Sequence, residues 1–285
     1  MSDQVDELEQ TRMPLLDHLR ELRRRVLISA GSIFVGMALC LTVARELFAL
    51  LTAPMRHVLG DLGDTPVDRA YLKLSKPIQD VFGEVTVEGT LAITSSPLEG
   101  VYTYLLVAVA GGVMLSSPVV AFQVWRFVAP GLYKTERRVV IPLATSSTVM
   151  FLLGALFAYA VIFPAAFPFF LQVIDVEAVL SIDGYLKTVV RMMLAFGLCF
   201  QLPVATWFLA RMGLIDHRDM IKGVRYAVVA IFVVAAIITP PDIMTQVLLG
   251  IPLVLLYMVG IVVAFLTTTK NRDEEDGDEE EAEVD

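Results

Sequence analysis

Two glutamates stand among arginines, each just before a long apolar run. Glu21 is followed by three arginines at positions 23–25, after which residues 26–44 carry no formal charge; Glu136 is followed by Arg137 and Arg138. A carboxylate accepts two parallel hydrogen bonds from the planar guanidinium of arginine, whereas lysine offers a compact point charge. Two such carboxylates predict a site for two guanidinium groups of a ligand. The alternative, that each glutamate only pairs with a neighbouring arginine, stays open because such surface pairs are common and weak.

Motifs for catalysis or metal binding are missing from the sequence. The three histidines, His18, His57 and His217, fall in separate polar segments, and no His-Glu-x-x-His pair, Gly-x-Ser-x-Gly elbow or phosphate-binding loop occurs. The two cysteines, Cys40 and Cys199, lie inside apolar runs and are expected to be buried free thiols. We therefore expect no enzyme, no metal and no cofactor.

The elements that position the two glutamates are predicted to be membrane-spanning helices. Hydrophobic residues make up 56% of the 285 residues, mean hydropathy is +0.69, and the 19% of charged residues gather at the two ends and in short stretches. This pattern is typical of an all-α polytopic membrane protein. Six spans are predicted at residues 26–51, 101–122, 139–163, 189–209, 226–238 and 243–267. The last two helices are expected to be short, since the fifth apolar run has about 13 residues, or about 20 Å of helix.

The distribution of basic residues predicts the orientation of the chain. Lysines and arginines lie before the first span, after the second, after the fourth and after the sixth. By the positive-inside rule, both termini are cytoplasmic. The predicted organisation has a disordered cytoplasmic N-terminus (residues 1–12), a membrane domain (13–269) and a disordered acidic tail (270–285), because the tail holds ten acidic side chains and little apolar surface.

Two outer loops and four prolines complete the prediction. The first outer loop, residues 52–97, alternates at 81–93 in a way that suggests a short hairpin, and the second covers residues 164–187. Spans are interrupted by Pro118, Pro142, Pro203 and Pro252. Each proline removes a helical hydrogen bond and favours a kink, so a curved wall is favoured over a straight bundle.

Four motifs follow one another between residues 13 and 269. They are Met13-Pro14-Leu15-x-x-His18-Leu19-x-Glu21-Leu22-Arg23-x-Arg25, Gln123-Val124-Trp125-x-Phe127-x-Ala129-Pro130-Gly131-Leu132-Tyr133-x-x-Glu136-Arg137-Arg138, Ala195-Phe196-Gly197-x-x-Phe200-Gln201-Leu202-Pro203, and Thr239-Pro240-Pro241-Asp242 with Gln246. Together they resemble the TatC family, the multispanning receptor of the twin-arginine protein translocase. The resemblance implies a glove-like, concave six-helix fold in a bacterial inner membrane. It also implies recognition of the twin-arginine signal peptides of folded exported proteins.

The resemblance assigns roles position by position. Glu21 and Glu136 correspond to the signal-binding carboxylates of the family. Four positions correspond to residues beside them: Arg23, Gln123, Phe127 and Arg137. Four others correspond to structural or docking positions: Pro54 at the outer end of span one, Asp242 in the last outer turn, and Thr239 and Gln246 at the docking site for the single-span partners TatA and TatB. Other copies of the chain are also expected partners, nucleic acid is not, and TatA and TatB are either two proteins or one dual-purpose protein.

Gln201 departs from the family pattern, because many members carry glutamate in span four at this position. Glutamine can hydrogen-bond but cannot titrate, so polarity is expected to suffice here. A simple hydrogen bond between helices is the equally weighted alternative.

Two other classes of function compete with export. A secondary transporter for a small solute fits the proline-broken helices, but the spans show no evident inverted repeat and almost no ionisable residue at their midplane. An intramembrane hydrolase lacks a catalytic pair within the spans.

Overall fold

The structure, a computed structural model, describes residues 15–58, 65–82, 91–92, 97–128, 140–166, 180–238 and 243–284. Its elements are, in chain order, α2 (Leu15–Thr42), α3 (Ala44–Val58), α4 (Pro66–Phe82), β1 (Leu91–Ala92), α5 (Pro97–Val128), α6 (Val140–Phe157), a π-helical turn (Ala158–Ile162), β2 (Leu180–Ser181), α8 (Ile182–Cys199), α9 (Leu202–Arg211), α10 (His217–Ile238) and α11 (Ile243–Val284). Among the described residues, six helical segments are long and apolar enough to cross a membrane. The prediction of an all-α protein with six spans is confirmed.

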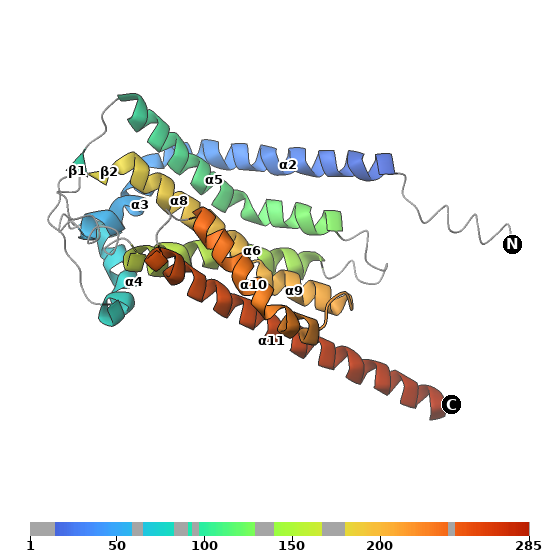
Figure 1. Ribbon diagram of the computed structural model, residues 1–285. Helices are drawn as coiled ribbons and strands as arrows, with labels where there is room; N and C mark the ends of the chain where they lie inside the picture. The colour runs from blue at the N-terminus through green and yellow to red at the C-terminus, as the bar shows by residue number, and fades with distance from the viewer. Residues whose placement is uncertain are drawn as a thin grey trace.

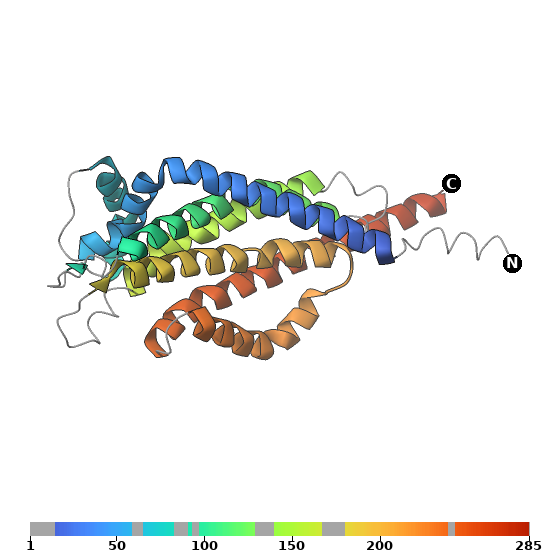
Figure 2. The same ribbon diagram turned by 90° about the horizontal axis from the view of Figure 1, so that it is seen from above.

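The spanning helices run between two opposite ends of the molecule (Figure 1). One end, called the basic end below, holds the start of α2, the end of α5 and the connection from α9 to α10, with the basic residues Arg20, Arg23, Arg24, Arg25, Arg126, Arg211, Arg218, Lys222 and Arg225. The other, called the strand end, holds α3, α4, β1 and β2 (Figure 2). The start of α2 and the C-terminal part of α11 lie at the basic end, as an even number of crossings requires. The glove-like outline itself stays a prediction.

The outer surfaces of the spans are apolar. Ile141 is 67% exposed, Leu198 66% and Ile237 72%, and large apolar side chains are exposed on all six spans. In water such a surface would be a severe liability, but hydrocarbon solvates it at no cost. The chain is therefore a multi-pass membrane protein.

Close helix packing in the span region depends on small residues. A Cβ atom added to Gly112 in α5 would lie 2.6 Å from the backbone nitrogen of Met37 in α2, and one added to Gly36 would lie 2.8 Å from the carbonyl oxygen of Gly112. Real Cβ atoms do not approach backbone this closely, so only glycine lets the two backbones meet here. The contact fixes where α2 crosses α5.

The first span is shorter than predicted. Helix α2 ends at Thr42, and after a turn at Val43 the chain continues as the separate helix α3, so residues 26–51 are not one span. The exposed Arg45 and Glu46 lie just beyond this turn. The prediction missed the break because apolar residues resume after the charged pair.

The fifth helix is longer than its apolar run indicates. Helix α10 has 22 residues, or about 33 Å at 1.5 Å per residue, because the polar segment beginning at His217 is helical too. The spans in α10 and α11 have 21 and 22 residues. They are the shortest of the six, but the prediction of a fifth helix of about 13 residues was wrong.

The predicted hairpin at residues 81–93 falls mostly on residues 83–90, which lie outside the described residues. Residues 81 and 82 end α4, and β1 pairs in parallel with β2, Leu91 opposite Leu180 and Ala92 opposite Ser181. The short strand thus joins the first outer loop to the second. Helix α4 itself was not predicted.

The four prolines that were predicted to interrupt spans divide into two kinds. Pro118 and Pro252 lie inside α5 and α11, where each removes a helical hydrogen bond. Pro142 lies in the first turn of α6, and Pro203 lies in the first turn of α9, just after the break at Phe200 and Gln201. A proline in a first turn costs nothing, because that N–H has no helical partner. Only the first two are therefore interruptions within a helix.

The C-terminal tail differs from its prediction. Helix α11 continues to Val284 and so includes most of residues 270–285, which composition predicts to be disordered. Glutamate has a high intrinsic helix propensity, which favours a helix in this segment. The segment projects beyond the other helices at the basic end (Figure 1).

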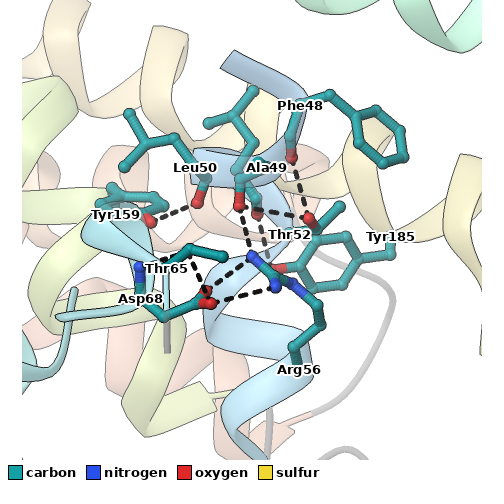
Figure 3. A network of polar contacts seen from close by, with 10 residues as sticks. Phe48, Ala49, Leu50, Thr52, Arg56, Thr65, Asp68, Tyr159 and Tyr185 are labelled. Carbon is teal, nitrogen blue, oxygen red and sulfur yellow. Dashed lines mark hydrogen bonds and ion pairs between the residues drawn. The ribbon is translucent and has the colours of Figure 1, made fainter. Parts of the chain in front are cut away.

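A buried polar network fastens α3 at the strand end (Figure 3). Pro54 lies inside α3 and lacks an N–H. The carbonyl of Leu50, four residues earlier, therefore does not receive its usual helical hydrogen bond. The hydroxyl of Tyr159 donates to this carbonyl, and the hydroxyl of Tyr185 donates to Leu51 O at 3.0 Å. Side chains from spans three and four thereby dock on α3.

The same network joins α3 to α4. Arg56 Nη2 lies 2.8 Å from Asp68 Oδ1 and donates to the carbonyl of Ala49 at 2.9 Å. Thr65 caps α4: its hydroxyl donates to Asp68 Oδ2 at 2.7 Å and accepts the N–H of Asp68 at 3.2 Å. The Asp68 side chain is fully buried. Tyr71 of α4 is buried as well, and its burial raises the pKa of the phenol to about 12, so the phenol stays neutral.

Candidate functional site

A charged cluster at the basic end joins α2 to α5. Glu21 and Arg25 are one turn apart on the same face of α2, and Arg25 Nη2 forms an ion pair with Glu21 Oε1. The other terminal nitrogen, Nη1, donates to Gln123 Oε1 in α5 at 3.3 Å. The Arg25 side chain is 13% exposed and that of Glu21 is 28% exposed, so the carboxylate is the more accessible partner.

The neighbours of this cluster are partly accessible. Phe127 lies one turn after Gln123 on α5 and is half-buried, while Arg23 on α2 is exposed. The structure thus brings Glu21 and Gln123 together, with Phe127 on the same side of α5. Glu136 and Arg137 lie outside the described residues, in the connection between α5 and α6.

Gln201 lies further along the spans, beside an apolar hollow. Its Nε2 donates to the carbonyl oxygen of Ser147 in α6 at 2.8 Å, and the hydroxyl of Ser147 accepts from Trp125 Nε1 at 2.7 Å. This is an interhelical hydrogen bond, as the alternative interpretation of Gln201 predicts. The hollow has a volume of about 440 Å³, and its lining includes Gln201, Trp125, Ser147, Ile33 of α2 and Leu198 of α8.

Of the two predicted docking residues, Gln246 lies on α11 and contacts α10. Gln246 Nε2 donates to the carbonyl oxygen of Phe232 at 2.8 Å, so the two helices are joined by a side chain. Gln246 also lines an open apolar groove of about 540 Å³ with Phe232, Val229, Val233 and Ile237. Thr239 and Asp242 lie outside the described residues.

The predicted site residues are thus spread over separate regions. Glu21, Arg23, Gln123 and Phe127 lie at the basic end, Gln201 lies beside the hollow, Gln246 lies between α10 and α11, and Pro54 lies in the network at the strand end. Within the described residues, no three histidine, cysteine, aspartate or glutamate side chains come together in a way that would hold a metal ion.

Sequence reasoning missed Arg25 as a member of the site. Its spacing of four residues from Glu21 was a readable signal for an ion pair on one helical face. Its bond to Gln123, 98 residues further along the chain, was not readable, because it depends on how α2 crosses α5.

Comparison with known proteins identifies the family. The model of the Sec-independent protein translocase protein (TatC) family matches residues 17–252. The chain is 36% identical over 276 residues to the Sec-independent protein translocase protein TatC of Desulforapulum autotrophicum, covering 96% of this chain and 91% of that protein. The chain belongs to the TatC family. A TatC protein of Escherichia coli is 34% identical over 265 residues, covering 92% of both chains.

A solved TatC structure has the same architecture. The crystal structure of a twin-arginine translocase receptor, TatC, superposes with a TM-score of 0.69 at 34% identity, covering 88% of this chain and 99% of that one. The predicted family is confirmed, and the comparisons support the protein-export prediction over the solute-transporter alternative. The match of the TatC family model includes Glu21, Gln123, Gln201 and Gln246.

Proposed function

We propose that this chain is the receptor subunit of a twin-arginine export system. It binds the signal peptides of folded precursors at its basic end and nucleates assembly of the translocation pore. The observation that carries the proposal is the Glu21–Arg25–Gln123 cluster: in a member of a translocase family, an accessible carboxylate at the end of two spans already holds one guanidinium.

Two carboxylates bind the arginine pair of the signal, and an apolar helix wall binds its apolar segment. Glu21 and Glu136 each accept one guanidinium of the arginine pair, with Arg23, Gln123, Phe127 and Arg137 around them. Bidentate pairing favours arginine over lysine, because the ammonium group cannot match the planar fork. The apolar segment of the signal lies along the helix wall at the hollow beside Gln201. Each square ångström of its apolar surface removed from water contributes about 25 cal/mol.

The orientation follows from the basic residues. The basic end faces the cytoplasm, so both termini are cytoplasmic and the chain lies in the inner membrane of a bacterium. The strand end, with Pro54, faces outward, as does the last outer turn that contains Asp242. TatA and TatB dock at Thr239 and Gln246, where the groove between α10 and α11 offers apolar area and one amide. Further copies of the chain share the receptor complex, and no cofactor or enzymatic step is needed by this subunit.

Photo-crosslinking tests the proposal. A precursor carries a photoreactive residue beside its arginine pair and is added to inverted membrane vesicles holding the chain and its partners. At a precursor concentration that gives a strong Arg-Arg adduct, we expect none with Lys-Lys, whose adduct needs far higher concentrations, and loss of the Arg-Arg adduct in the Glu21→Gln, Glu136→Gln double variant. Glu46→Gln is the matched control, because Glu46 is an exposed carboxylate on α3 at the opposite end. Normal crosslinking in the double variant would refute the carboxylate site.

A further inference from the structure

Arg25 occupies the position that a ligand guanidinium would take on Glu21. Its Nη2 pairs with Glu21 Oε1 and its Nη1 reaches Gln123 at 3.3 Å. Within the described residues, the buried Nε of Arg25 has no hydrogen-bond partner. The side chain is more buried than the glutamate it neutralises, at 13% against 28% exposure. Arg25 is therefore held in the site and is not a solvated surface charge.

The neighbouring arginines behave differently. Arg23 and Arg24 are exposed, and neither makes a hydrogen bond or ion pair to another described residue. Arg23, two residues after Glu21, lies on a different face of α2, whereas Arg24, three residues after Glu21, is close to that face but points into solvent without pairing with the carboxylate. Of these three consecutive arginines, Arg25 is the one positioned to compete for the carboxylate.

We propose that Arg25 is a resident guanidinium that fills Glu21 in the unoccupied receptor and must leave it when a signal arginine binds. This inference rests on the proposed function and adds to it a competing residue within the chain. Gln123 makes the exchange feasible, because its oxygen accepts from Arg25 independently of Glu21. The displaced guanidinium keeps that acceptor, so no charge is left without a hydrogen bond.

The exchange sets a threshold for binding. A signal arginine replaces one guanidinium–carboxylate pair by another, so the arginine contact alone adds little net free energy. Binding then depends on the rest of the signal, above all on its apolar segment. Competition of this kind lowers the affinity of every ligand for Glu21 by the same factor. Arg25 therefore excludes weak signals without changing the preference for arginine over lysine.

The size of the effect follows from the geometry. Exposed ion pairs one turn apart are weak, and charge-assisted hydrogen bonds in protected sites are stronger; the partly buried Arg25 pair lies between these limits. Removing the competitor should raise signal affinity about three- to tenfold. A residue with a merely structural role would lower affinity or leave it unchanged.

The experiment measures the affinities of Arg-Arg and Lys-Lys precursors for the assembled translocase in inverted vesicles, by crosslinking yield against precursor concentration. Arg25→Gln removes the competitor, and Arg25→Lys keeps the charge but loses the fork. Arg24→Gln is the control, because it removes the same charge from the adjacent exposed position. The amount of each variant in the membrane is measured in parallel.

We expect Arg25→Gln to raise both affinities by the same factor. Arg25→Lys should raise the affinities by a smaller factor, and this rise cannot come from a change in net charge. If Arg25→Gln fails to insert into the membrane, Arg25→Lys still tests the inference by itself. Arg24→Gln should not raise affinity by a comparable factor. A fall in Arg-Arg affinity, or a rise no larger than that of Arg24→Gln, would overturn the inference.

A further variant separates the two proposals. Glu21→Gln should abolish Arg-Arg binding both with Arg25 and with Arg25→Gln. If Glu21→Gln leaves binding intact, the proposed carboxylate site fails. If Glu21→Gln abolishes binding but the Arg25 variants show no gain, the site stands and only the competitor is refuted.

Discussion

Replacement of Arg56 by methionine tests the buried network at the strand end. The Asp68 side chain is fully buried and pairs with Arg56 Nη2 at 2.8 Å, so Arg56→Met leaves a buried carboxylate without its cation. Breaking a buried pair from one side costs about 3–5 kcal/mol. The hydroxyl of Thr65 still donates to Asp68, which places the expected loss near the lower limit. A loss of about 3 kcal/mol lowers Tm by about 6–12 °C in a chain of this size.

The buried thiol of Cys40 provides the assay. Cys40 is 8% exposed and lies against α5, where a Cβ atom on Gly111 would approach its Sγ to 2.9 Å. In a Cys199→Ala background, Cys40 is the one cysteine left. A thiol-reactive fluorescent dye then reports the thermal unfolding of the purified chain in detergent, because unfolding exposes this thiol. The dye should react at a lower temperature in Arg56→Met.

Two further variants make the reasoning refutable. Lys73→Met removes an exposed charge from α4 and should change Tm by less than about 2 °C. Adding Asp68→Asn to Arg56→Met removes the orphaned charge and should recover at least half of the loss, because replacing both partners avoids a buried unpaired ion. A Tm fall below about 2 °C in Arg56→Met, or no recovery in the double variant, would refute the argument.

Three other predictions concern the spans. Gly112→Val should abolish accumulation of folded protein, because the valine side chain would meet the backbone of α2. Gly31→Val should be tolerated, since nothing lies within 4 Å of a Cβ atom at that position. The yield of each variant from membranes after detergent extraction measures both effects. Tyr159→Phe should cost about 1 kcal/mol, and much less in a Pro54→Ala background that restores the helical donor; a double-mutant cycle by thermal melting that shows additive losses would contradict this. Gln201→Leu should cost about 0.6 kcal/mol for one interhelical bond and leave signal crosslinking intact, so lost crosslinking would show that its polarity is needed.

The spans were predictable because each carries its own signal. Runs of apolar residues bounded by charges locate all six, and no knowledge of their packing is needed. The ends of the spans were less predictable, because helices continue through polar residues when their backbone bonds are satisfied. Helix α10 therefore begins at His217, well before its apolar run.

Helix α4 had a local signal that was not used. Thr65 followed three residues later by Asp68 is a capping pattern, and Pro66 suits the first helical position. The pairing of β1 with β2 had no such signal, because its partners are some 90 residues apart and belong to different loops. Strand pairing of this kind depends on how the spans are arranged.

The site divides in the same way. Glu21 and its ion pair with Arg25 follow from a spacing of four residues, whereas the link to Gln123 follows from the crossing of α2 and α5. Pro54 was predicted as a structural position. The hydroxyl that bonds the Leu50 carbonyl left free by Pro54 comes from Tyr159, 109 residues after Leu50. A side-chain contact was therefore predictable where both residues lie on the same helix, and was not predictable where another span supplies the second residue.

The two ends of the molecule are held together by different kinds of contact. At the strand end, α3 is bound to spans three and four through backbone carbonyls and to α4 through a fully buried carboxylate, so nothing there can exchange without exposing unsatisfied groups. At the basic end, α2 meets α5 through an accessible glutamate and a guanidinium with a second acceptor. Between them, the backbone contact of Gly36 with Gly112 fixes the crossing. In the exchange that we propose, a signal arginine replaces the Arg25 contact at Glu21 while the crossing and the outer network keep the six spans assembled.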